Sequence, residues 1–511
     1  MAEYLSPAVY IEEKSSGSKP IEGVGTSTAA FVGHAEKGPV GEAVPVNNFS
    51  EFQKKFGGYI DNGFLAFAVK AFFDEGGTSC YVVRTCHYTG ITPAAVASFK
   101  VIKAPSTGTP DSIQVSAHSP GAWGNDIAVA ITHGTGDTFN LEVSYKGKGV
   151  ENYTGLVVDK TSNDHVETKV NGVSSYIRVV DLTSNLSAAD ARPAVTTSAQ
   201  GVLTGGADGL GSLTASDYTG DESLGSGLHA FDKIDGINIV AIPDALERAV
   251  HIGGMTYCEN RGDCFYVADS QEAIETADNV LNYKLSQGDY AGGNAINSKY
   301  GALYSPWISV LDPRTGGTID IPPSGAVAGL YARTDGTRGV HKAPAGVVDG
   351  KFRTALDVVK VFTDADQAKL NPKGINVIRK IKGVGNVAWG GRTVSSDPEW
   401  RYLNVRRLFL FLEKSIENAT KWVVFEPNDR NLWKSITRNV SAFLKLQWMS
   451  GALVGDTEEE AYYVKCDEET NPQESIDLGR VITEIGVAPS KPAEFVIFRI
   501  AQYQGGSEIS E

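Results

Sequence analysis

The chain has 511 residues, and 41% of them are hydrophobic, which is enough apolar material for several cores and predicts roughly three or four domains. With 61 acidic and 46 basic side chains, its formal net charge is -15, which argues against a general attraction to nucleic acid or to an anionic membrane. The N-terminus lacks an apolar run behind basic residues, and no apolar stretch is long enough to span a bilayer. We therefore expect synthesis in the cytoplasm without a signal peptide, and no membrane insertion.

The five cysteines are too few and too scattered for a disulfide framework in a chain of this length. Cys80 and Cys86 share a C-x5-C spacing with Cys258 and Cys264, but structural zinc sites usually use closer pairs. We expect reduced thiols, no metal and no cofactor.

The first 20 residues begin with a β-prone run, PAVYIEE, and continue with the Ser-, Gly- and Lys-rich KSSGSKP. This order predicts an extended arm on a flexible tether. Residues 26–85 then alternate between a strand (AAFVG), two helices (NFSEFQKKFG and GFLAFAVKAFFDEGG) and a strand (CYVVRT). That pattern predicts an α/β unit.

Residues 94–200 contain short alternating segments such as FNLEVSYKG and SYIRVVDL, separated by Gly, Asn, Asp and Ser. Strands at this spacing without helices predict an inserted β-rich domain. Helices and strands alternate again over residues 201–364, which predicts a second α/β unit.

The run IDIPPSGAVAGLYARTDGTRGVHKAPAG, within residues 319–346, is dense in Gly and Pro and predicts an irregular but ordered loop. Arg333, Asp335 and Arg338 are close enough in this run to form a local charge-assisted network.

The last part of the chain predicts a helix (RYLNVRRLFLFLEKSIENA), a strand (KWVVFEP), a long helix (RNLWKSITRNVSAFLKLQWMSG) and two strands (AYYVKCD and AEFVIFRIAQYQ). The long helix has an apolar face, an expected cap at Asn428 or Asp429 and an expected end at Gly451. Its apolar face is formed by Leu432, Ile436, Val440, Phe443 and Leu444. A stripe of cations lies away from that face: Arg430, Lys434, Arg438 and Lys445. A solvated helix face explains such a stripe as well as a binding surface does.

Motifs for catalysis are weak. GSGLHA and GVGNVA fit G-x-G-x-x-A, and a dinucleotide site needs a strand before such a motif and a helix after it. GSGLHA follows a polar loop, and GVGNVA follows the strand-like INVIRKI but continues into WGGRTVSSDP, which does not predict a helix. TGGADGLGS lacks the lysine of a phosphate loop, and neither H-E-x-x-H nor G-x-S-x-G occurs. We assign no catalytic residue. The alternative that stays open is a nucleotide-linked or redox enzyme on the central α/β unit, with the glycine loops and Cys258 and Cys264 as its site.

Several longer motifs identify a family. The run YSPWISVLDPRTGGTIDIPPSGAVAGLYARTDGTRGVHKAPAG resembles the signature of contractile tail sheath proteins of phage tails, pyocins and extracellular injection systems. LSPAVYIEE and FFDEGGTSCYVVRT resemble the N-terminal region of that family, and DPEWRYLNVRRLFLFLEKSIENATKWVVFEPND resembles its C-terminal region. No shared motif occurs in residues 94–200, in keeping with the variable outer domains of the family.

The resemblance implies a non-enzymatic structural subunit that polymerises as a helix around an inner tube and contracts to drive the tube through a target envelope. Its partners would be further copies of itself, the inner tube protein, and baseplate and terminal cap proteins, without nucleic acid. Its final location would be a phage tail or an injection particle, after synthesis in the bacterial cytoplasm.

The expected fold class is a multidomain α/β (α+β) chain with an inner α/β domain built from both chain ends. The expected division is an N-terminal arm (1–22), the first part of the inner domain (23–93), an inserted β-rich outer domain (94–200), a central α/β domain (201–364), the second, tube-facing part of the inner domain (365–492), and a C-terminal strand arm and tail (493–511).

Both termini are β-prone, and in the family such arms join neighbouring subunits. A free strand completes an open sheet edge of a neighbour by β-augmentation, and a head-to-tail contact of this kind builds a helical polymer. The predicted inter-subunit arm strands comprise Pro7, Val9, Tyr10, Ile11, Phe495, Ile497, Phe498 and Ile500. The cation stripe is the candidate for attachment to the tube. Two alternatives stay open: that the arms are internal edge strands of a monomer, and that the protein is an adhesin or a capsid-like shell subunit.

Overall fold

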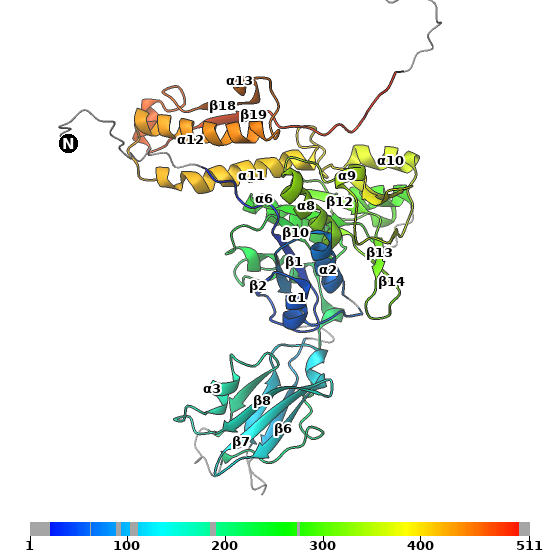
Figure 1. The fold of residues 1–511 in the computed structure, drawn as a ribbon, viewed down its shortest axis with the longest axis vertical. Coiled ribbons are helices and arrows are strands. Elements are labelled where there is room, and N and C mark those ends of the chain that lie inside the picture. The colour runs from blue at the N-terminus through cyan, green and yellow to red at the C-terminus, as the bar shows by residue number, and fades with distance from the viewer. Residues whose placement is uncertain are drawn as a thin grey trace, which may run out of the picture.

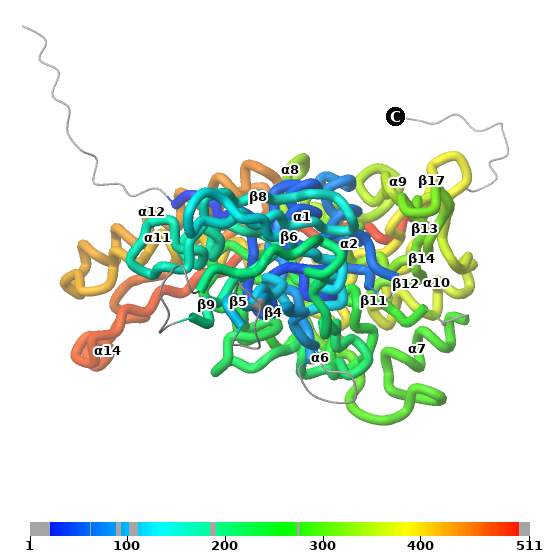
Figure 2. Tube along the Cα trace, turned by 90° about the horizontal axis from the view of Figure 1, so that it is seen from below, coloured from blue at the N-terminus to red at the C-terminus, as the bar shows by residue number. Residues whose placement is uncertain are grey.

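The computed structural model describes residues 21–61, 63–87, 94–102, 111–183, 191–272 and 276–499. Three parts follow one another along the long axis (Figure 1): a domain of strands, an α/β body, and a helical part around α11 (Leu403–Thr420) and α12 (Arg430–Met449). Seen along that axis, α11 and α12 extend to one side of the molecule (Figure 2). The mixed α/β fold expected from the sequence is confirmed at this coarse level.

The body is built on an eight-stranded sheet with the strand order β17-β16-β12-β11-β10-β1-β3-β2. Its six inner strands are parallel, and the edge strands β2 and β17 are antiparallel to their neighbours. Most inner strands are short apolar runs because helices cover both faces of the sheet. The bounds are β1 Ala29–Gly33, β2 Ala43–Val46, β3 Cys80–Arg84, β10 Ile239–Ala241, β11 Phe265–Asp269, β12 Gly301–Ser305, β16 Ile375–Ile381 and β17 Gly385–Ala388.

Alternate residues of each inner strand pack on opposite faces. Phe31 of β1 lies in the core with Phe72 and Leu330, whereas its neighbour Val32 lies with Val250 and Val280 in the other core. The first core holds α1 (Phe49–Phe56), α2 (Leu65–Glu75) and α8 (Ser324–Arg338). The second core holds α5 (Ala215–Thr219), α6 (Arg248–Arg261), α7 (Ala277–Leu285) and α10 (Asp364–Leu370). Beside the sheet lie α9 (Gly346–Asp349) and a small sheet of β14 (Thr318–Ile321), β13 (Ile308–Leu311) and β15 (Asp357–Val358).

The strand order corrects the expected division of the body. Residues 23–93 and 201–364 were expected in different domains, yet β1 pairs with β3 on one side and with β10 on the other. In addition, β16, from the segment 365–492, pairs with β12. Local alternation of helices and strands does not specify which distant strands become neighbours, and so the sequence pattern did not predict this shared sheet.

The Gly- and Pro-rich run 319–346 is also different from the prediction, because its middle forms the regular helix α8. A Cβ atom on Gly325 would lie 2.4 Å from the Cα of Ala68, and one on Gly329 would lie 2.5 Å from the carbonyl oxygen of Phe72. These glycines allow α8 to approach α2 closely instead of making turns.

The outer domain, at one end of the molecule in Figure 1, contains two three-stranded antiparallel sheets, β4-β5-β9 and β6-β7-β8. Both contribute to one core, in which Val115 and Val179 meet Ile131 and Leu141. The bounds are β4 Ser98–Ile102, β5 Asp111–Ala117, β6 Ile127–His133, β7 Phe139–Tyr145, β8 Lys148–Leu156, β9 Ile177–Asp181 and α3 Val166–Val170.

The helical part packs α12 on α11 and adds a small two-stranded sheet. Its core joins Leu408 and Leu412 of α11 to the predicted apolar face of α12. The predicted strand KWVVFEP is wrong: this segment forms a short 3-10 turn, Lys421–Val423, and leaves Phe425 fully exposed. The remaining bounds are α13 Glu458–Ala461, β18 Tyr462–Lys465, α14 Gln473–Asp477 and β19 Glu484–Val487.

Candidate assembly surfaces

The two dinucleotide-like glycine motifs are turns. GSGLHA leads into a short 3-10 helix, Gly227–Phe231, and its Gly225 has a φ of 60°. GVGNVA begins in the turn between the antiparallel strands β16 and β17, where Gly383 has a φ of 80°, and its last four residues are β17 itself. Neither motif places free N–H groups of a helix after a parallel strand, which is what a pyrophosphate site requires.

The carboxyl edge of the parallel sheet, where α/β proteins usually bind ligands, is filled by contacts within the chain. The carboxylate of Asp244 accepts hydrogen bonds from the backbone N–H of His34, at 2.6 Å, and of Phe64. The ring nitrogen Nε2 of His34 lies 2.6 Å from the hydroxyl of Tyr218. In the described part of the chain, no group of His, Cys, Asp and Glu side chains could hold a metal ion.

The thiols proposed for a redox site are buried. Cys258 and Cys264 have no exposed surface, and burial raises the pKa of Cys258 well above its ordinary value. Because the thiolate is the reactive form, this environment disfavours thiol chemistry.

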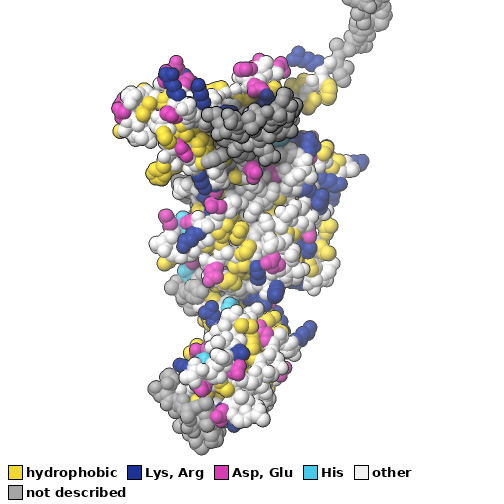
Figure 3. All heavy atoms as spheres, turned by 60° about the vertical axis from the view of Figure 1, so that its left-hand side comes forward, with side chains coloured by type: hydrophobic (Ala, Val, Ile, Leu, Met, Phe, Trp, Pro, Cys, Tyr) yellow, Lys and Arg dark blue, Asp and Glu magenta, His cyan; other side chains and the backbone are white. Residues whose placement is uncertain are grey.

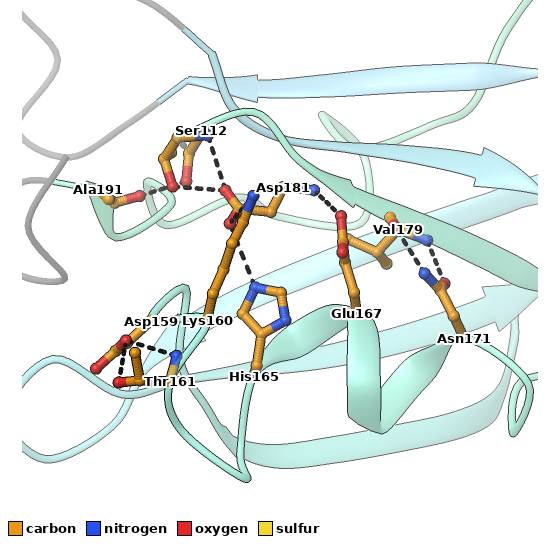
Figure 4. Close-up of polar contacts among 11 residues, drawn as sticks. Ser112, Asp159, Lys160, Thr161, His165, Glu167, Asn171, Val179, Asp181 and Ala191 are labelled. Atoms are coloured by element: carbon orange, nitrogen blue, oxygen red, sulfur yellow. Dashed lines mark hydrogen bonds and ion pairs between the residues drawn. The ribbon is translucent and has the colours of Figure 1, made fainter. Parts of the chain in front are cut away.

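A polar cluster near α3 and β9 in the outer domain is also satisfied internally (Figure 4). The carboxylate of Asp181 accepts hydrogen bonds from the N–H and the hydroxyl of Thr183, and lies 3.3 Å from Nε2 of His165. Burial raises the pKa of Asp181, but these hydrogen bonds outweigh it and keep the pKa below its ordinary value. The cluster therefore holds α3 and β9 together.

The predicted network of Arg333, Asp335 and Arg338 is instead three separate ion pairs with other elements. Arg333 pairs with the buried Glu75 of α2 at 2.6 Å. Asp335 pairs with Arg407 of α11, and both side chains are buried. Arg338 lies 3.4 Å from Asp349. The three side chains fix the position of α8 relative to α2, α11 and α9.

The helix α12 begins and packs as predicted. The carboxylate of Asp429 accepts hydrogen bonds from the N–H groups of Asn431 and Leu432, at 2.8 and 2.9 Å. The predicted apolar face is buried throughout, and α12 ends at Met449 just before Gly451, which has a φ of 82°.

The four cations of the stripe are all exposed, but they are not equivalent. Arg430 pairs with Glu468, and Lys445 pairs with Glu458. Lys434 and Arg438 have no ion pair with any other described residue. Figure 3 shows basic and acidic side chains side by side over this end of the molecule. Among the described residues, the charge of the stripe is therefore unpaired only at Lys434 and Arg438.

Of the predicted arm residues, Pro7, Val9, Tyr10, Ile11 and Ile500 lie outside the described residues. The other three belong to no strand and are largely exposed: Phe495 by 74%, Ile497 by 79% and Phe498 by 84%.

The described end of each arm contacts the helical part or the body. Glu494 accepts a hydrogen bond from Nε of Arg392 at 2.9 Å, and both side chains are largely buried. At the other terminus, Ile21 lies in the core with α11 and α12, and the N–H of Val24 donates to the hydroxyl of Ser415 at 3.1 Å. Each arm thus starts from a fixed point.

The sheet of β18 and β19 is a surface that the sequence pattern did not predict, because EIGV was not recognised as a strand. The two strands pair antiparallel from Tyr462↔Val487 to Lys465↔Glu484. Neither has a second strand beside it in the part of the chain that the structure describes. Such open edges can accept a strand from another chain.

Sequence comparison identifies the family. The model of the phage tail sheath protein central domain matches residues 211–394, and the model of the phage tail sheath C-terminal domain matches residues 395–502. Together these consecutive matches cover more than half of the chain. The chain belongs to the phage tail sheath family. The resemblance inferred from the sequence motifs is thereby confirmed.

Individual relatives of this sheath chain are distant. The tail sheath protein of Enterobacteria phage T4 is 26% identical over 330 residues, which cover 60% of the chain and 48% of that relative. The chain thus spans about half the length of the T4 protein. The tail sheath protein of Burkholderia phage BcepMu is 22% identical over 512 residues, covering 96% of the chain and 95% of the relative.

The fold is shared with a solved sheath. The sheath complex of the extracellular contractile injection system PVC, in its contracted state, superposes with a TM-score of 0.60 at 21% identity. The match covers 98% of this chain and 99% of that chain. The sheath chain described here therefore has the same fold over nearly its whole length.

Proposed function

We propose that this chain is the structural, non-enzymatic subunit of a contractile sheath, which polymerises helically around an inner tube and contracts to drive the tube through a target envelope. The observation that carries the proposal is the unbroken match of residues 211–502 to the two sheath domains. The turns at both glycine motifs and the burial of Cys258 and Cys264 count against the enzymatic alternative.

Polymerisation proceeds by exchange of terminal arms. The donor is the C-terminal segment after Glu494, whose exposed apolar side chains have no partner strand among the described residues, together with the N-terminal arm. The acceptor is the open sheet of β18 and β19 on a neighbouring copy. Strand addition satisfies the backbone groups of the edge and buries the apolar side chains of the arm, and each subunit stays linked to its neighbours while they move.

The helical part faces the tube, and Lys434 and Arg438 provide the contact. Because neither is neutralised by a described acidic side chain, both are available for acidic groups on a tube protein. Exposed ion pairs are individually weak, which allows release during contraction. Contraction itself is a change from one packing of subunits to another of lower free energy and requires no nucleotide.

The sheath ends at a baseplate and at a terminal cap, and the particle is a phage tail or an extracellular injection device, assembled after synthesis in the bacterial cytoplasm. No nucleic acid takes part, in keeping with the net charge of -15. No helix in the described part of the chain has the length and apolar character needed to span a membrane.

Arm exchange is tested by deleting residues 1–19 or residues 495–511, which leaves the ion pair of Arg392 and Glu494 intact. Each truncated protein should be folded by circular dichroism and should no longer form long sheaths by negative-stain electron microscopy. A point variant, Ile497→Asp, should have the same effect because it places a charge in the added strand. Its matched control is Leu224→Asp, because Leu224 has the same 79% exposure outside the arm. Long contractile sheaths from both truncated proteins would disprove arm exchange.

A further inference from the structure

The junction between the body and the outer domain lies at the carboxyl edge of the parallel sheet. The strand order reverses at β1, which has β3 on one side and β10 on the other, and such a reversal is the usual ligand position of an open α/β sheet. In this protein the loop 34–38 after β1 and the last residue of β3, Arg84, contact the outer domain there. The outer domain thus occupies the place that a ligand would take.

Lys37 from this loop is enclosed by the outer domain. Its side chain is nearly buried, with 7% exposure, and Nζ lies 4.4 Å from the ring centre of Tyr176 and 5.9 Å from those of Trp123 and Tyr145. The rings also contact one another: the centres of Trp123 and Tyr145 are 6.0 Å apart, and those of Tyr145 and Tyr176 are 5.6 Å apart. We call these three rings and the ammonium group the Lys37 clasp.

The three rings come from separate elements of the outer domain. Trp123 lies in a 3-10 turn, Ala122–Asp126, Tyr145 ends β7, and Tyr176 precedes β9. The rings therefore meet only when the outer domain is folded, and Lys37 reaches them only when the body is folded.

Hydrogen bonds on both sides of Lys37 set the position of the loop. Arg84 donates from Nη1 to the carbonyl oxygen of Gly38 at 3.1 Å and to that of Pro120 at 2.8 Å. Glu36 accepts from the hydroxyl of Tyr145 at 2.6 Å and from Nζ of Lys146 at 2.7 Å. The loop is thus held to the outer domain at the residues before and after Lys37.

Two opposing effects act on the ammonium group. Burial lowers the pKa of Lys37, and the carboxylates of Glu36 and Glu151 oppose that shift. The faces of three aromatic rings add an attraction for the charged form, which is strongest where water is excluded. The clasp stabilises the junction when the attraction of the carboxylates and rings for the ammonium group exceeds the free energy lost by burying that group.

We infer that the Lys37 clasp fixes the outer β domain on the body, so that the two parts keep one orientation and move as a single rigid unit. The inference concerns the isolated chain and does not depend on sheath assembly.

The clasp is tested in the full-length protein by hydrogen–deuterium exchange with mass spectrometry. Lys37→Met keeps the apolar stem but removes the charge, and it should accelerate exchange about tenfold in peptides spanning residues 34–40 and 118–124, which corresponds to about 1.4 kcal/mol. Peptides from β11 and β12 should exchange as in the wild type, which shows that the body sheet remains folded. Lys148→Met is the matched control, because Lys148 is exposed on the outer domain.

A double-mutant cycle with Tyr176→Leu separates the cation–ring contact from simple packing. If the clasp acts through the charge, Lys37→Met should accelerate exchange less in the Tyr176→Leu background than in the wild type, because one of the three rings is already missing. Wild-type exchange at the junction in Lys37→Met, or additive effects of the two substitutions, would overturn the inference.

Discussion

The carboxyl group of Asp269 is fully buried at the end of β11, where it faces the start of α8. Its Oδ1 accepts a hydrogen bond from the N–H of Ser324 at 2.8 Å, and its Oδ2 has no hydrogen-bond partner among the described residues. Burial raises the pKa of Asp269 to about 7, although the contacts with Ser324 oppose this. The folded protein thus keeps this carboxyl group protonated into a pH range where an exposed aspartate is ionised.

His251 lies beside Asp269, and its titration changes the free energy of unfolding with pH in the opposite direction. Its Nε2 is 2.9 Å from the carbonyl oxygen of Asp269, and burial lowers the pKa of His251 to about 4. The contribution of Asp269 to the free energy of unfolding is greatest below its unfolded pKa of about 3.9, and it is lost as pH rises to about 7. The contribution of His251 to the free energy of unfolding is greatest above its unfolded pKa of about 6.5, and it is lost as pH falls to about 4. The two contributions largely cancel in the wild type.

We therefore predict that Asp269→Asn reveals the contribution of His251. Between pH 4.5 and 6.5 the free energy of unfolding of the variant should rise by up to about 1.4 kcal/mol per pH unit relative to the wild type, because the opposing proton uptake at Asp269 is removed. Urea unfolding at several pH values measures this slope. Asp137→Asn, on an exposed turn of the outer domain, is the control and should leave the slope unchanged. Parallel profiles for Asp269→Asn and the wild type would contradict the prediction.

The contact between α2 and α8 shows how one residue type can have opposite roles along one helix. Gly325 and Gly329 face α2 with no space for a side chain, whereas a Cβ on Gly336 would meet nothing within 4 Å. Glycine in an exposed helical position costs backbone entropy without any gain from close packing.

Accordingly, Gly329→Ala should lower the free energy of unfolding by about 1–3 kcal/mol or more, because the new methyl group collides with the backbone of Phe72. Gly336→Ala in the same helix should raise it by about 0.5–1 kcal/mol. Urea denaturation of both variants measures the difference. If the two substitutions have the same sign, the glycines of α8 do not serve close packing.

At the scale of elements, amphipathic periodicity predicted the helix α12 correctly, whereas glycine content predicted a loop where the helix α8 forms. The apolar face and the cap of α12 could be predicted because Leu432 and Ile436 repeat at helical spacing after Asp429. The Gly and Pro content of residues 319–346 predicts an irregular loop in place of α8, because the role of Gly325 and Gly329 is visible only from their contacts with the partner helix α2. The false strand KWVVFEP has β-prone residues but no partner strand in the described part of the chain, and Val424 and Phe425 are exposed.

The distribution of charge matters at the scale of the whole molecule. On a chain with a net charge of -15, Lys434 and Arg438 form a small basic site on the exposed face of α12, with no ion pair to any described residue. The sequence predicted the stripe but could not show that Glu468 and Glu458, from later segments, neutralise its two ends. Pairing between distant segments is a property of the folded chain.

Reversing both charges, Lys434→Glu with Arg438→Glu, should reduce assembly of sheath on purified tubes. Wild-type assembly should weaken with added salt, because screening shortens the range of exposed charges. The melting temperature should change little because both side chains are exposed and neither forms an ion pair with a described residue. Lys54→Glu with Lys148→Glu changes the net charge equally on exposed positions elsewhere and should assemble normally. If the first variant covers tubes as well as the wild type does at low salt, α12 is not the attachment surface.

The molecule is elongated, with α12 at one end and the outer domain at the other (Figure 1), and this shape affects how closely neighbouring subunits pack at each end. In a tubular assembly with α12 toward the axis, the circumference available to each subunit grows in proportion to radius. Copies of α12 then share the narrowest circle, and copies of the outer domain share the widest. A given rotation of a subunit also moves its outer domain along the longest arc. Residues of the outer domain would then have the most space between neighbouring subunits.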